Sequence, residues 1–355
     1  MEYVMALHEL KIKNRIARVP IIQGGMGVGV SRSRLAGAVA REGGVGMISS
    51  AQIGYDEPDF EQDVCGCNLR AIEKHVRLAK QQADGGLVGV NVMVALQHYA
   101  GHVKAAVHAG ADLIVCGAGL PAELPELVQD TDAAIAPIVS SRKAARVILR
   151  MWDKKYGRTA DLLVVEGPKA GGHLGFAPEQ IGQLSALDYD EEIRQIIQEK
   201  KLYEDKYGVQ IPVVVGGGIF DRADMEHMLE LGADGVQLAT RFVATEECDA
   251  SLAYKQAYIQ AKDEDAVIVK SPVGMPGRAI RNAFIQKAQQ GRIPVEKCFQ
   301  CIKKCSPREV PYCITQALIH AVRGNLEQGL IFCGANVGKI QEITTVAALM
   351  RELTA

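Results

Sequence analysis

Eight short apolar runs recur along the first 245 residues, and segments with the 3.6-residue periodicity of amphipathic helices separate them. The runs are continuous rather than alternating, which indicates strands buried on both faces, as in a parallel sheet covered by helices. Eight strand–helix units in this length predict an α/β fold of the TIM (β/α)8 barrel type. The alternative is an open doubly wound sheet, but the number of runs and the polar or glycine residues that follow nearly every run favour the barrel. The predicted strands lie within residues 20–25, 44–50, 87–94, 112–119, 133–141, 161–167, 211–219 and 234–242.

The pattern changes after residue 245, where the chain becomes helical, charged and interrupted by proline and glycine. We therefore expect residues 1–245 to form the barrel and residues 246–328 to form a smaller, mainly helical cap or substrate domain. Residues 329–355 contain a glycine turn and a last amphipathic helix, and this segment is expected to return to the barrel.

The composition excludes several classes of function. The 355 residues carry a net charge of −2 without a basic stripe, which argues against nucleic-acid binding. Charged residues interrupt the N-terminal apolar patches, and all apolar runs are too short to span a bilayer. Nine cysteines, an odd number, argue against a disulfide framework. We expect a cytoplasmic protein that does not bind membranes.

Ligands of such barrels bind at the carboxyl ends of the strands. Here those ends are rich in glycine, amide and hydroxyl groups and poor in metal ligands. Gly216–Gly218 follow the seventh strand, and Ala239 and Thr240 follow the eighth, where barrels commonly hold a phosphate through backbone N–H groups. Gln23–Met26, after the first strand, offer bare backbone to a flat ring. The alternative for these glycines is close packing of strand on helix.

His173 lies in the stretch VVEGPKAGGHLGF, on a glycine turn directly after the sixth strand. An imidazole with a pKa near 6.5 suits general acid–base chemistry or the binding of an anionic substrate. The alternative is an incidental histidine in a tight turn. No serine or cysteine accompanies it in the arrangement of a hydrolytic triad.

Four cysteines, Cys298, Cys301, Cys305 and Cys313, lie close together with spacings of two, three and seven residues. Such thiols can bind zinc or an iron–sulfur cluster. No standard zinc-finger or ferredoxin pattern fits, however, and cysteine also serves as a buried apolar residue. The sequence leaves a metal or cluster open, and we assign no metal ligand from it.

Five motifs in the same order resemble the nitronate monooxygenase (2-nitropropane dioxygenase) family, which is related to the flavin-dependent enoyl-acyl-carrier-protein reductases of type II and to quinone reductases. The resemblance covers the barrel and the closing segment, and its most specific part is the AGGH turn followed by GADGVQLATRF. It implies a TIM barrel that binds FMN without a covalent link. The motifs are PIIQGGMGVGVS with LAGAVAREGGVGMI, VGVNVMV, EGPKAGGHLG, PVVVGGGI and GADGVQLATRF.

By position, the resemblance implies the residues that hold FMN and the one that faces the substrate. His173 would be the catalytic residue above the flavin. The flavin ring would contact Gln23, Gly24, Gly25 and Met26, with Asn91 at its polar edge or ribityl chain. The phosphate would lie against Gly171, Gly172, Gly217, Gly218, Ala239 and Thr240, and Glu166, Gly216 and Gln237 complete the predicted cofactor set.

The implied activity is that of an oxidoreductase that oxidises alkyl nitronates with O2 to a carbonyl compound and nitrite. The first alternative is an NAD(P)H-dependent enoyl-acyl-carrier-protein or quinone reductase on the same fold. The second is a barrel that binds flavin or a phosphate ligand without catalysis and serves as a subunit. A homodimer is possible in each case.

Overall fold

The computed structural model describes residues 7–183 and 186–355 and confirms the predicted barrel. Eight parallel strands close in the order β10-β11-β3-β4-β5-β6-β7-β8, and each lies inside one of the predicted runs. The strands are β3 (Ile21–Gln23), β4 (Val45–Ser49), β5 (Leu87–Met93), β6 (Leu113–Gly117), β7 (Ala134–Val139), β8 (Leu163–Glu166), β10 (Val213–Gly216) and β11 (Gly235–Leu238).

The continuous apolar runs arise because successive residues of a strand face two different cores. In β4, Met47 packs inside the barrel with Ile22 and Val115, whereas the next residue, Ile48, packs in the outer layer between strands and helices. Both side chains are almost completely buried. A strand in this position has no solvent-facing side, so polar residues are confined to its ends.

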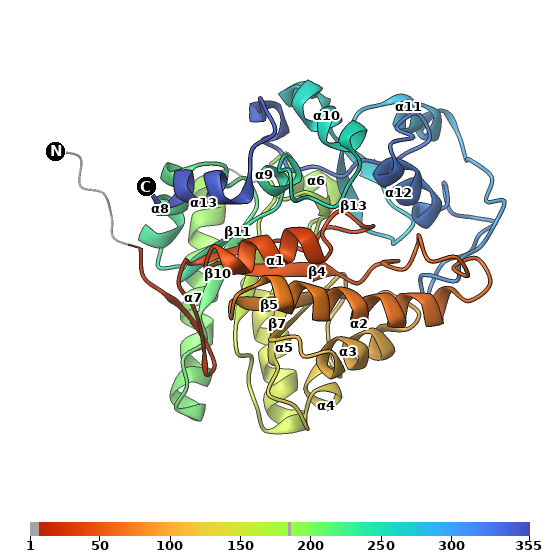
Figure 1. Cartoon of the computed structure of the whole chain (residues 1–355). Helices are drawn as coiled ribbons and strands as arrows, with labels where there is room; N and C mark the ends of the chain where they lie inside the picture. The colour runs from red at the N-terminus through yellow and green to blue at the C-terminus, as the bar shows by residue number, and fades with distance from the viewer. Residues whose placement is uncertain (1–6, 184–185) are drawn as a thin grey trace.

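Helices cover the outside of the barrel, as Figure 1 shows for α2, α3 and α5. α5 illustrates how the sequence sets their limits. The Ser141 hydroxyl accepts from the N–H of Ala144 at its start, and Gly157, with φ of 60°, ends it. The helices of this part are α1 (Ser33–Arg41), α2 (Val64–Gln82), α3 (Tyr99–His108), α4 (Leu124–Leu127), α5 (Arg142–Tyr156), α6 (Pro178–Ile181), α7 (Ala186–Tyr207), α8 (Arg222–Glu230) and α9 (Thr240–Val243).

A β-hairpin that the sequence did not predict closes the amino-terminal end of the barrel. It consists of β1 (Leu10–Ile12) and β2 (Arg15–Ala17), which pair antiparallel. Leu10 and Ile12 are fully buried among the residues of the barrel interior. The hairpin therefore blocks this end, and the carboxyl ends of the strands are left to form a ligand site.

The segment predicted as a mainly helical cap contains strands as well. Its helices are α10 (Leu252–Gln260), α11 (Ala283–Gln290) and α12 (Ile314–Arg323), and in Figure 1 they gather at one end of the barrel. Between them, β12 (Ala266–Lys270) and β13 (Pro276–Ile280) form an antiparallel sheet with β9 (Gly172–His173), so that the AGGH turn of the barrel is paired to the cap. Short 3-10 turns span Asp263–Asp265 and Val337–Lys339, and the last helix, α13 (Val346–Thr354), packs against α1 and α8.

Among the helices of the described residues, none combines the length and hydrophobicity needed to cross a bilayer.

Candidate active site

A cavity of about 220 Å³ lies at the carboxyl ends of the strands. The structure brings most of the predicted site residues to its wall. These are Gly24, Gly25, Met26, Asn91, Glu166, Gly171, Gly172, His173, Gly217, Gly218, Gln237, Ala239 and Thr240.

Two predicted residues, Gln23 and Gly216, are not part of this wall. The Gln23 side chain is fully buried, accepts a hydrogen bond from the N–H of Met47 at 3.0 Å and donates one to the carbonyl of Gly24. Gly216 is the last residue of β10 and packs against Gln237. Both residues lie behind the cavity surface and support residues that form it.

The glycines of the cavity are sites where a side chain would collide with its neighbours. A Cβ added to Gly25 would lie 2.4 Å from the Cβ of Asn91. At Gly217, φ is +105°, and an added Cβ would lie 2.9 Å from the backbone nitrogen of Ala170. At these two positions only glycine lets bare backbone form the wall, which is what a ligand in contact with main-chain N–H groups needs.

The turn that carries these contacts is fixed by a buried arginine of the cap. Arg278, in β13, donates hydrogen bonds to the carbonyl oxygens of Pro168 at 2.9 Å and Ala170 at 2.5 Å. Its backbone pairs with Gly172. Strand pairing and side-chain bonds together hold the AGGH turn in place.

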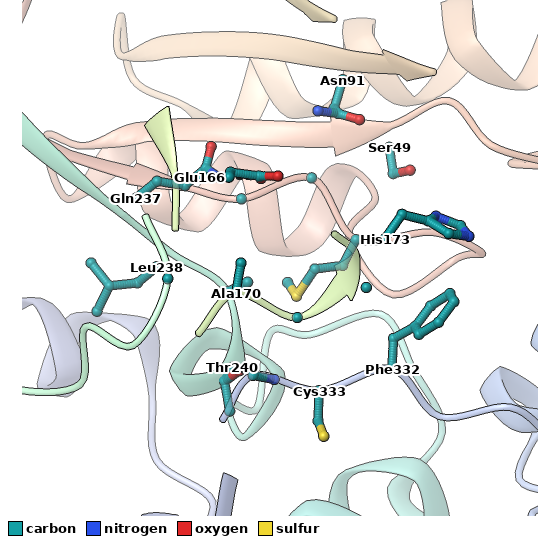
Figure 2. A pocket seen from close by; sticks show the side chains of 18 of the residues that line it. Ser49, Asn91, Glu166, Ala170, His173, Gln237, Leu238, Thr240, Phe332 and Cys333 are labelled. Atoms are coloured by element: carbon teal, nitrogen blue, oxygen red, sulfur yellow. Dashed lines mark hydrogen bonds between the residues drawn. The ribbon is translucent and has the colours of Figure 1, made fainter. Parts of the chain in front are cut away.

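His173 lies at one side of the cavity beside Phe332, as Figure 2 shows. Its Nε2 is 2.7 Å from the hydroxyl oxygen of the buried Ser271, and the edge of its ring meets Phe332 at a centroid distance of 5.0 Å. Burial lowers the pKa of His173 to about 4. The imidazole is therefore neutral at pH 7, and since Nε2 is bonded to Ser271, Nδ1 is the nitrogen available to a ligand.

Glu166 and Gln237 form a pair at another side of the cavity (Figure 2). The Gln237 amide donates to Oε1 of Glu166 at 3.0 Å. Burial raises the pKa of Glu166 to about 7, although the bond from Gln237 opposes this shift. Near neutral pH the carboxyl group can thus hold a proton and donate a hydrogen bond to a polar ligand atom.

The closing segment supplies the remaining wall, next to Thr240. The Thr240 hydroxyl oxygen accepts from the N–H of Gly334 at 3.0 Å, and the Asn336 amide donates to the carbonyl of Gly218 at 2.6 Å. These contacts could not be predicted from the sequence, because the partners lie far apart in the chain. Further lining residues, from the cap and the closing segment, were not expected from the sequence: Tyr254, Tyr258, Leu318, Phe332 and Cys333.

In residues 7–183 and 186–355, no three histidine, cysteine or acidic side chains come close enough to hold a single metal ion.

The sequence model of the protein family described as "Nitronate monooxygenase" matches residues 9–355, almost the whole chain. The chain belongs to the nitronate monooxygenase family. Its members are oxidoreductases and, as a group, flavin-dependent enzymes. The glycine-lined cavity of this nitronate monooxygenase family member agrees with that class, because it offers bare backbone and hydrogen-bonding groups to a cofactor.

Individual relatives are distant. A probable nitronate monooxygenase of Staphylococcus aureus (strain Newman) is 26% identical over 310 residues, which cover 79% of this chain and 82% of the relative. The (3aS,4S,5R,7aS)-5-hydroxy-7a-methyl-1-oxo-octahydro-1H-indene-4-carboxyl-CoA dehydrogenase of Mycobacterium tuberculosis is 27% identical over 272 residues, 77% of this chain. The match spans 66% of that dehydrogenase, slightly less than two thirds of its length.

Solved structures show the same fold. FabK from Thermotoga maritima is 26% identical, with a TM-score of 0.71, and the match covers 94% of this chain and 91% of that one. Nitroalkane oxidase from Streptomyces ansochromogenes is 20% identical with a TM-score of 0.70 and coverage of 94% of both chains, a likeness that concerns the fold alone.

Proposed function

We propose that this chain is an FMN-dependent nitronate monooxygenase that oxidises alkyl nitronates with O2 to a carbonyl compound and nitrite. The observation that carries the proposal is a single cavity that joins a bare-backbone cradle to a neutral histidine. Family membership supports the reaction class. The choice of a nitronate as substrate is part of the proposal and is supported by a neutral histidine that can bind an anionic nitronate group.

The residues present fit FMN. The backbone of Gly24 and Gly25, where a side chain at Gly25 would collide with Asn91, offers a flat surface to the isoalloxazine ring. Gly217, Gly218 and the Thr240 hydroxyl would hold the phosphate at the ends of the last two strands, the usual phosphate position in these barrels.

A bound FMN would supply the redox chemistry, taking electrons from the nitronate and passing them to O2. The chain's own part is to bind and orient the substrate. If the Ser271 hydroxyl donates to Nε2, Nδ1 of the neutral His173 carries the proton and can donate a hydrogen bond to a nitronate oxygen. If Nε2 donates to Ser271 instead, Nδ1 can accept the α-proton of a nitroalkane. Phe332 limits rotation of the imidazole and keeps water from that side of the ring.

A second candidate is an NAD(P)H-dependent reductase of an enoyl thioester. The similarity to Thermotoga maritima FabK at 26% identity, with nearly complete coverage of both chains, favours it. A quinone reductase belongs to the same group, since it too would draw electrons from a nicotinamide.

Anaerobic mixing of the purified flavin-loaded protein with propyl-2-nitronate, NADH or NADPH separates these candidates. We expect the flavin absorbance to bleach with the nitronate, and nitrite to form once O2 is admitted. Bleaching by a nicotinamide at catalytic rates, with none by the nitronate, would overturn the first candidate in favour of the second. Bleaching by none of the three would indicate a binding protein without catalysis.

A further inference from the structure

The segment between α11 and α12, residues 291–313, has no helix or strand of its own and contains four of the nine cysteines. It is joined to the barrel near the end of β5 by hydrogen bonds from Gln97 N–H to the carbonyl of Cys301 and from Lys303 N–H to the carbonyl of Ala95, both 3.0 Å. Long irregular segments are uncommon inside compact folds and usually serve a function. It is also held by an ion pair between Lys297 and Glu61 and by stacking of Phe299 on Phe60. The function of its four thiols is the feature to explain.

Cys298 and Cys301 border one cavity, and Cys301 and Cys313 pack against one apolar cluster. Cys305 follows Cys301 by four residues. Burial raises the pKa of Cys301 to about 11, and the nearby thiols of Cys313 and Cys305 add to the rise. The pKa of Cys313 is likewise raised by burial, with contributions from Cys298 and Cys305. None of the four is in a disulfide.

Hydrogen-bond donors point at three of the sulfur atoms. The backbone N–H of Gln300 donates to Sγ of Cys298 at 3.4 Å. The Thr315 side chain bonds to Cys301, and the backbone N–H groups of Thr315 and Gln316, in the first turn of α12, bond to Cys313. Such bonds stabilise thiolates and are typical of the surroundings of metal-bound sulfur.

The charges of the segment also favour a bound anionic group. Lys303, Lys304 and Arg308 lie between the second and fourth cysteines, whereas Glu309 is the single acidic residue there. A cluster ligated by four thiolates carries net negative charge, which these cations would offset.

The ligand spacing that each group requires distinguishes a cluster from a single ion. A zinc ion binds sulfur at about 2.3 Å, so its sulfur ligands lie about 3.8 Å from one another. The described residues contain no three ligands close enough for one ion. A [4Fe–4S] cluster holds its four thiolates farther apart and is ligated by four cysteines. We infer that Cys298, Cys301, Cys305 and Cys313 ligate a [4Fe–4S] cluster.

The position of this group relative to the active site is given by the packing of α12. Cys301 and Cys313 pack in one apolar cluster with Leu318, and Leu318 lines the active-site cavity. The iron–sulfur cluster would thus lie one layer of side chains from that cavity. Its presence does not depend on which substrate the cavity takes.

The test is to purify the full chain without oxygen, reconstitute it with ferrous iron and sulfide, and measure iron, acid-labile sulfide and zinc per chain. We expect about four iron and four sulfide, together with an electron paramagnetic resonance signal of a reduced cluster after dithionite. Cys301→Ser and Cys313→Ser should each lose most of the iron. The matched control is Cys65→Ser, which removes a thiol from α2 that borders the same small cavity as Cys298 and Cys301.

Stoichiometric zinc without iron, or iron far below cluster stoichiometry after reconstitution, would overturn the inference. Full iron content in the Cys301 and Cys313 variants, or its loss in Cys65→Ser, would refute the ligand assignment. Circular dichroism and flavin content report whether each variant folds. If the buried variants fail to fold, Cys298→Ser replaces them, because Cys298 is exposed and its substitution leaves the packing intact.

Discussion

Gly217→Ala tests the proposed phosphate cradle with the smallest possible change. The added methyl group would lie 2.9 Å from the backbone nitrogen of Ala170 and 3.1 Å from the carbonyl oxygen of Gly167. Both neighbours are backbone atoms, so no side chain can rotate away to make room. Relief requires a shift of Gly217 or of the neighbouring turn, which Arg278 holds through the carbonyls of Pro168 and Ala170.

Two costs contribute to the expected effect. A left-handed backbone conformation costs alanine about 1–2 kcal/mol, and overpacking a tight site costs about 1–3 kcal/mol. If about 2 kcal/mol of this total falls on the cofactor site, FMN binds about 30-fold more weakly. The same cost should also lower the thermal stability of the flavin-free protein.

Titration of the flavin-free protein with FMN, followed by flavin fluorescence, measures the change in affinity. The control is Gly110→Ala, where φ is +93° but an added Cβ meets nothing within 4 Å. This variant carries the backbone cost without the collision, so it should lower Tm by a few degrees and leave FMN affinity unchanged. Wild-type FMN affinity in Gly217→Ala would refute the assignment of the cradle.

Three further substitutions test individual contacts. His173→Ala should keep its flavin while steady-state turnover falls by about 10²- to 10⁴-fold; near-normal turnover would remove its catalytic role. Burial raises the pKa of Glu166 from 4.5 to about 7. The protonated carboxyl group therefore stabilises the folded state below pH 4.5, and this stabilisation is lost as the pH rises through 7. In urea titrations of the flavin-free proteins, the wild type should lose about 3 kcal/mol of unfolding free energy between pH 4.5 and 8 relative to Glu166→Gln. If the difference in unfolding free energy between the two proteins did not vary with pH, the burial of this carboxyl group would be contradicted. Arg278→Met removes two hydrogen bonds from the guanidinium group to carbonyl oxygens, so Tm and FMN affinity should fall together. The control Arg292→Met, at an exposed arginine, should change neither. Equal effects of the two substitutions would argue against a special role for Arg278.

The barrel could be predicted from the sequence because burial on both faces leaves a continuous apolar run for each strand. The β1–β2 hairpin has no such run, since charged residues alternate with the buried ones, as in Leu10–Ile12. β12 is largely solvent-accessible along its length, and β13 pairs with residues about a hundred positions away. Pairing of this kind depends on the tertiary fold and leaves no local pattern in the sequence.

The same distinction applies to the site. The glycines and His173 could be found because each directly follows a predicted strand, and the barrel brings all such ends together. Ser271 is 98 residues from His173, and Arg278 is 108 residues from Ala170. Only the return of the cap onto the AGGH turn joins these partners. Phe332 and Asn336 reach the cavity in the same way, from the closing segment.

A crystal structure of the FMN-loaded protein is the most direct test of the proposed site. The isoalloxazine ring should lie against Gly24 and Gly25, the phosphate beside Gly217 and Thr240, and the imidazole of His173 should face the ring across the space left for substrate. A protein that takes up no FMN, or density that places the flavin away from His173, would contradict the account.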